Sequence, residues 1–169
     1  MRSKILSLVL ITSFIAGCSS YKPKFAKKGE FSAPAGWSYK KRNSKGVKSI
    51  CYNSPRDPKT NASKFAIQFD LLGSKQYPNI EKYSKDILEE LLKGKTFVWV
   101  KKTGTTTVDG LPCTKFAGEI SASDIDKRVV FMGRLIKDGP RFYYVTGYCK
   151  KQDEEQFKPI FEKFVHSLK

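Results

Sequence analysis

Residues Lys127 to Lys150, KRVVFMGRLIKDGPRFYYVTGYCK, decide the fold of this chain. The pair Asp138-Gly139 is typical of tight turns between antiparallel strands. On either side of this pair lies a run rich in β-branched and aromatic residues, which strands favour. The stretch therefore predicts two neighbouring antiparallel strands, 127–137 and 140–150, joined by a tight turn.

A second turn signal, Asp109-Gly110, lies upstream and predicts another hairpin. Its strands are 95–108 and 111–120, so the second half of the chain is expected to form a meander of four strands. Near the start, Phe65, Ile67 and Phe69 alternate with polar residues, as in a half-buried strand. The strands expected there are 36–41, 48–52 and 64–72, with a loop from Ser54 through Pro58.

Two segments have the periodicity of amphipathic helices. The first follows Pro78-Asn79, carries apolar residues at helical spacing over 80–92, and can end at Gly94. The second follows Asp153, which together with Gln156 predicts a capping box. Its apolar stripe runs from Phe157 to Leu168. Pro159 predicts either a kink in the first turn or a later start, near Gln156.

The order of these elements predicts an α+β fold: an antiparallel β-sheet with helices packed across it. We assign residues 31–169 to one α+β domain, because a chain of this length builds one substantial core.

Several stretches resemble the PsbP-like family. They are Phe31-Ser32-Ala33-Pro34-Ala35-Gly36-Trp37, Val108-Asp109-Gly110-Leu111-Pro112 and the hairpin from Lys137 to Thr146, together with the helix in mid-chain and the phenylalanine-rich final helix. The family includes an extrinsic subunit of photosystem II, a Ran-binding nuclear import factor and bacterial envelope lipoproteins. The resemblance implies the same fold and a binding or assembly module, with no catalytic residue to carry over.

The amino terminus resembles the signal peptide of a bacterial lipoprotein. Arg2 and Lys4 precede an apolar run, which is followed by Ile15-Ala16-Gly17-Cys18, a lipobox. The resemblance implies cleavage after residue 17 and acylation of Cys18, whose lipid would anchor the chain to the membrane. Residues 1–17 are then a lipoprotein signal peptide, and residues 18–30 a lipidated flexible tether. Ser19, in place of an aspartate, implies sorting to the periplasmic face of the outer membrane.

Positive charge is concentrated near this expected anchor. The chain carries 32 Lys and Arg against 16 Asp and Glu, a net charge of +16. From Ser19 to Thr60 there are eleven basic and two acidic residues, a net +9. Such a segment is attracted to anionic lipid or to phosphate-rich polymers, although it can also simply be solvated. The candidate contacts are Lys40, Lys41, Arg42 and Lys45. Nucleic acid is disfavoured as a partner, because an exported protein seldom meets it.

Three cysteines remain once Cys18 is assigned to the lipid: Cys51, Cys113 and Cys149. An oxidising compartment favours one disulfide and one leftover thiol, although three buried thiols are the alternative. Cys113 begins one strand and Cys149 ends the strand two places later, so these two should lie at opposite ends of the sheet. We therefore predict a Cys51–Cys149 disulfide and a reduced Cys113.

Catalytic and metal-binding patterns are weak. The single histidine, His166, lies near the carboxy terminus with no evident partner for a triad. Asp124 and Asp126, with Glu119 nearby, lack the further ligands of a calcium loop. The sequence therefore predicts no enzyme, no metal and no cofactor. The favoured function is a lipid-anchored, non-enzymatic binding or scaffold module for another envelope component, and the alternative is a periplasmic carrier or sensor of a small apolar or anionic ligand.

Overall fold

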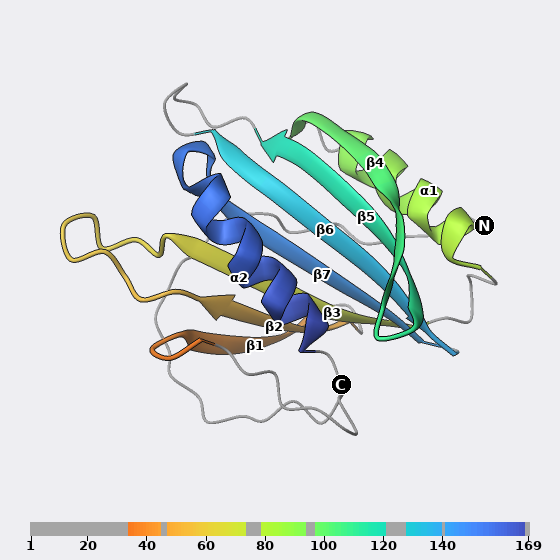
Figure 1. Cartoon of the computed structure of the whole chain (residues 1–169), viewed down its shortest axis with the longest axis horizontal. Coiled ribbons are helices and arrows are strands. Elements are labelled where there is room, and N and C mark those ends of the chain that lie inside the picture. Colours follow the sequence, from red (N-terminus) through yellow and green to blue (C-terminus); the bar gives the residue numbers. More distant parts are fainter. Residues whose placement is uncertain are drawn as a thin grey trace.

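The computed structural model describes residues 34–44, 47–73, 79–93, 97–120, 128–139 and 141–167. These residues form one antiparallel sheet of seven strands with two helices (Figure 1). The elements are β1 Ser38–Ser44, β2 Val47–Asn53, β3 Phe65–Gly73, α1 Ile80–Lys93, β4 Phe97–Val108, β5 Leu111–Ile120, β6 Val129–Asp138, β7 Arg141–Lys150, a short 3-10 turn Lys151–Asp153, and α2 Glu154–His166. The strand order is β1-β2-β3-β7-β6-β5-β4. The α+β prediction is confirmed.

The hairpin predicted at Asp138-Gly139 is at the centre of the sheet. Asp138 pairs with Arg141, and Gly139 has a φ of +53°, in the left-handed region that glycine tolerates. β6 and β7 lie between β5 and β3. Both faces of these strands pack against other residues, so their middle positions are mostly apolar, with Arg134 and Thr146 as buried polar exceptions.

The helices cover opposite faces of the sheet. Figure 1 shows α2 in front of the strands and α1 behind them, near β4 and β5. α2 buries its phenylalanines against Ile50, Ile67 and Val145, and we call this the α2 side. α1 packs on the other side, where Phe116, Leu135 and Phe142 are buried, and we call this the α1 side. Two separate cores therefore lie one on each side of a single sheet.

Gly147 sets how closely α2 approaches the sheet. A β-carbon at this position would lie 2.6 Å from the Phe161 ring and 2.8 Å from the Phe157 ring. Only a residue without a side chain leaves room for both rings. The glycine therefore lets two fully buried phenylalanines lie directly on β7.

The start of α1 agrees with the prediction, whereas the start of α2 does not. Asn79 Oδ1 accepts a hydrogen bond from the backbone N–H of Lys82 over 2.8 Å and so caps α1, as expected. The capping box of α2 is not formed, because the Asp153 side chain makes no cap hydrogen bond. Lys64 is the residue directly before β3. Its Nζ lies 3.0 Å from Asp153 Oδ1 and donates to Gln156 Oε1 over 2.6 Å. Pro159 lies inside a helix that begins at Glu154, so the later start near Gln156 is wrong.

The predicted Cys51–Cys149 disulfide is wrong, because Cys51, Cys113 and Cys149 are all free thiols. Cys51 lies opposite Gln68 of β3, and Cys149 lies opposite Phe65 of the same strand. Gln68 and Phe65 are separated by an odd number of positions. Alternate residues of a strand point to opposite faces, so the two thiols lie on opposite sides of the sheet. Cys113 and Cys149 do lie at opposite ends of β6, as predicted.

Candidate functional site

Three of the predicted cationic contacts lie on β1, an edge strand of the described sheet. Lys40, Lys41 and Arg42 are all exposed. Lys40 and Arg42 lie on the α1 side and Lys41 on the α2 side, because successive residues alternate. Their cross-strand partners on β2 are, in order, Cys51, Ile50 and Ser49, which are uncharged. The three cations therefore form one run along the edge strand. Lys45 lies outside the described residues, as do Cys18, Asp124 and Asp126.

A second surface, which the sequence did not predict, is marked by the two tryptophans of the chain. One cross-strand row runs through Ser38, Asn53, Ala66, Tyr148, Phe131, Gly118 and Val100. Trp37 directly precedes the first residue of this row and Trp99 directly precedes the last. The two tryptophans thus lie at the same end of the sheet, at its opposite edges. We call this end the tryptophan end.

Trp37 is held at the point where the described domain begins. Its N–H donates to the Pro34 carbonyl over 3.1 Å, closing a turn in which Gly36 has a φ of +82°. A positive φ at the third residue of a turn is the type II geometry that requires glycine. The Trp37 ring then stacks on Phe65, with centroids 6.4 Å apart. The described part of the chain therefore begins at the tryptophan end.

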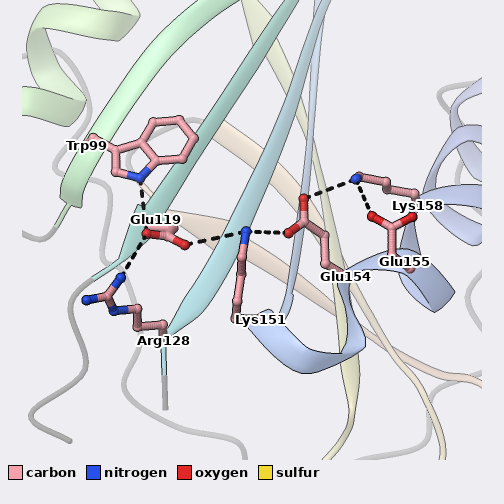
Figure 2. Close-up of polar contacts among 7 residues, drawn as sticks. All are labelled: Trp99, Glu119, Arg128, Lys151, Glu154, Glu155 and Lys158. Atoms are coloured by element: carbon pink, nitrogen blue, oxygen red, sulfur yellow. Dashed lines mark hydrogen bonds and ion pairs between the residues drawn. The ribbon is translucent and has the colours of Figure 1, made fainter. Parts of the chain in front are cut away.

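Trp99 lies on the outermost strand at the other edge and is 39% exposed. The register of β4 shifts between Phe97 and Trp99, which leaves Val98 56% exposed. The indole N–H of Trp99 donates to Glu119 Oε2 over 3.1 Å (Figure 2). Lys101 places its Nζ 5.7 Å from the centre of the Trp99 ring, a cation–π contact. The ring is thus exposed but fixed in orientation.

Glu119 joins the tryptophan to a network of charges at the start of α2. Its oxygens lie 3.7 Å from Arg128 Nη1 and 3.6 Å from Lys151 Nζ. Lys151 also binds Glu154 at 2.6 Å, and Glu154 lies 3.3 Å from Lys158 (Figure 2). The Lys151 ammonium lowers the pKa of Glu154 through this hydrogen bond. One chain of contacts therefore links β4, β5 and α2.

Around the start of α2 the acids lie inside and the cations outside, apart from Glu155, which is 88% exposed. The side chains of Glu119, Asp153 and Glu154 are 9%, 11% and 20% exposed. Their partners Lys64, Arg128, Lys151 and Lys158 are 43–55% exposed. Inner carboxylates therefore hold the cations in place while their positive ends face solvent. The arrangement suits contact with an anionic surface.

The sequence signal for this network is faint. Glu119 and Trp99 are 20 residues apart along the chain, and they meet because a bulge between Lys102 and Gly104 shifts the register of β4 against β5. A glutamate on the inward face of a strand was the available hint, because a buried carboxylate needs partners.

Catalytic and metal-binding sites are not evident in the described residues. His166 is exposed on the last turn of α2. Within the described ranges there is no group of three His, Cys, Asp or Glu side chains that could hold a metal ion. The described helices are too short or too polar to span a bilayer.

Comparison with solved structures identifies the fold. The chain matches the solution structure of the cyanobacterial PsbP protein CyanoP from Synechocystis sp. PCC 6803, with a TM-score of 0.58, 11% identity, and coverage of 90% of this chain and 96% of that chain. It also matches PA94 from Pseudomonas aeruginosa, a protein of unknown function, with a TM-score of 0.56, 11% identity, and coverage of 72% and 81%. LpqN of Mycobacterium tuberculosis, involved in cell envelope biogenesis, matches with a TM-score of 0.47, 13% identity, and coverage of 79% of this chain and 77% of that chain.

No protein-family model matches the chain. No curated protein matches it either. At these identities the structural likeness defines the fold alone, and the fold is PsbP-like.

Proposed function

We propose that this protein is a lipid-anchored component of the bacterial envelope, whose single domain binds another envelope component without catalysing a reaction. The observation that carries the proposal is the run of exposed cations Lys40, Lys41 and Arg42 on edge strand β1. A cationic strand at an exposed edge suits an anionic lipid, polymer or protein surface. The lipobox ending at Cys18 supplies the anchor, and Ser19 favours the outer membrane.

The described thiols support the absence of catalysis. Burial raises the pKa of Cys113 to about 11 and that of Cys149 to about 12, and it also raises the pKa of Cys51. A reactive cysteine needs a lowered pKa, because the thiolate is the nucleophile. These three side chains are therefore suited to packing and not to nucleophilic attack.

The packing favours a binding surface over a ligand carrier. Aromatic rings fill the contact between the sheet and α2, where Phe65 stacks on Phe157 at 5.0 Å and Tyr52 meets Phe164 edge-on at 5.0 Å. On the α1 side, Tyr83 meets Phe142 edge-on at 4.9 Å. A carrier needs room between the sheet and its helices, whereas these contacts are those of a packed core.

Charge reversal on β1 tests the proposal. The variant Lys40→Glu/Lys41→Glu/Arg42→Glu should lose association with the envelope component that copurifies with the wild type. Raising the salt concentration should mimic the variant. The control Lys82→Glu/Lys85→Glu/Lys93→Glu makes the same charge change on three exposed lysines of α1 and should bind as the wild type does. Equal binding by the two variants would contradict a role for β1.

Fractionation tests the location. On a sucrose gradient the protein should sediment with outer-membrane markers. Sedimentation with the inner membrane would contradict the sorting proposed from Ser19.

A further inference from the structure

We infer that the tryptophan end faces an anionic bilayer, with Trp99 inserted among the lipid headgroups. The inference rests on the proposed lipid anchor, and it adds the face that the domain turns toward the membrane. In this orientation the bilayer contacts the tryptophan end, and the envelope partner contacts the cations of β1. Four observations carry it, and only the first depends on the lipobox.

The first observation is the short separation along the chain between the expected anchor and the tryptophan end. Pro34 begins the described part and is tied to Trp37 at the tryptophan end. Pro34 lies sixteen positions after Cys18. A flexible segment of that length has an end-to-end distance of roughly 20–24 Å, less than the width of many domains. A lipid on Cys18 would therefore hold this end of the sheet nearest to the leaflet.

The second observation is the exposed apolar surface at Val98 and Trp99. Both side chains project from β4 where its register shifts, so they sit at a bulged corner of the edge strand. Tryptophan is enriched at membrane interfaces because its ring is apolar and its N–H is polar. The N–H of Trp99 is already bonded to Glu119, so its ring can enter the headgroup layer without losing a hydrogen bond.

The third observation is the sign of the charge around this ring. Lys101, Arg128 and Lys151 are all exposed, whereas Glu119, the acid that Arg128 and Lys151 approach, is buried. The exposed acid of the network, Glu155, pairs with Lys158 at 2.7 Å. An approaching anionic headgroup therefore meets cations first. Each such cation near an anionic leaflet strengthens binding about fivefold.

The fourth observation is that the fixed charges disfavour a second copy of this chain as the occupant. If two copies paired through their β4 edges, Lys101 and Lys102 of each would lie in the same contact. Like charges brought together in this way repel. An acidic protein surface would not meet this repulsion, and it is the alternative that the experiment below distinguishes.

The two tryptophans make the inference directly measurable, because each can be left as the only indole. The full-length protein, purified from membranes, is reconstituted into mixed phosphatidylcholine–phosphatidylglycerol vesicles that carry bromine near the top of the acyl chains. In the Trp37→Phe variant, Trp99 emission should shift to the blue and fall by about half or more, as expected for a ring in the headgroup layer. In the Trp99→Phe variant, Trp37 emission should change little, because its ring is stacked on Phe65.

Charge is tested in the same background. Adding Arg128→Gln and Lys151→Gln to the Trp37→Phe variant should abolish most of the quenching of Trp99, and so should vesicles of phosphatidylcholine alone. Quenching that does not depend on lipid charge, or that is equal for the two tryptophans, would overturn the inference. A photo-crosslinker at residue 99 that captures an acidic protein, with Trp99 unquenched, would also overturn it.

Failure of the anchor has a different signature. A chain without acyl groups would be washed from the vesicles by high salt, whatever the quenching at low salt. A chain that stays bound with Trp99 unquenched would contradict only the orientation.

Discussion

The Trp99 indole donates its N–H to the Glu119 carboxylate across the β4–β5 pair, over 3.1 Å. This single bond orients an exposed ring on an edge strand. The same carboxylate lies within 4 Å of Arg128 and Lys151, so it joins the ring to the start of α2. Glu119 is thus the centre on which the geometry of the tryptophan end depends.

Glu119→Ala should free the Trp99 indole N–H and remove the acid that Arg128 and Lys151 share. We expect the free energy of unfolding to fall by about 1–3 kcal/mol, the usual loss when a buried hydrogen-bonding group is removed. In a Trp37→Phe background, the anisotropy of Trp99 emission should also fall. Glu155→Ala is the control, because that exposed acid should change stability by less than about 0.5 kcal/mol. Equal effects of the two changes in urea unfolding would contradict this role.

Gly147→Ala should destabilise the fold by about 1–3 kcal/mol, the cost of overpacking a core. The added methyl group would lie 2.6 Å from the Phe161 ring, so α2 would have to move away from β7. Thr105→Ala on exposed β4 is the control for a small change in a strand. Unchanged urea unfolding of the Gly147→Ala variant would show that α2 packs less closely than described.

Asp70→Asn should stabilise the protein at neutral pH, by about 1 kcal/mol, a typical size for a point substitution. Burial raises the pKa of Asp70 above its ordinary 3.8, against hydrogen bonds from Ser49 and Gln68 that lower it. A raised pKa in the folded state means that the stability Asp70 contributes is complete below pH 3.8 and is lost as the pH rises through the folded pKa.

The Asp70→Asn variant should not show this loss, because its amide does not ionise. Thermal unfolding of both proteins between about pH 3 and pH 7 measures the difference. A variant that is less stable than wild type at neutral pH would mean that the ionised carboxylate is stabilised by its neighbours.

The three free thiols should not react with an alkylating reagent in the folded protein, and all three should react after unfolding. Without reductant, an alkylating reagent should label none of Cys51, Cys113 and Cys149 in the native chain and all three in urea. Since burial raises the pKa of Cys113 from 9.0 to about 11 and that of Cys149 to about 12, stability should fall as the pH rises from 9.0 through these values. If only one of the three cysteines is labelled in urea, the other two form a disulfide, which would contradict the three free thiols.

The fold could be predicted because its signals are local. Asp109-Gly110 and Asp138-Gly139 each mark a hairpin, and the helical spacing after Asn79 marks α1. Antiparallel strands joined by tight turns leave little freedom in how they pair, so the meander β4 to β7 followed directly.

The errors come from geometry that is not local. The face on which Cys51 lies depends on the register between β2 and β3, which a long loop leaves open. Lys64 draws Asp153 and Gln156 away from a capping box because the start of β3 passes beside α2, a contact across 89 residues of chain from Lys64 to Asp153. The Glu119 network was missed for the same reason, since it needs the bulge in β4.

Metabolic labelling of the lipid on Cys18 tests most directly the central claim, that a membrane anchor holds this domain at the envelope. Cells are grown with an alkyne analogue of palmitate, and the protein is recovered and coupled to a fluorophore. The wild type should carry the label and sediment with membranes. Cys18→Ser should carry none, while Cys51→Ser, which alters a cysteine of the folded domain, should be labelled as the wild type is. A wild-type chain without label, or a Cys18→Ser chain that keeps it, would contradict the account.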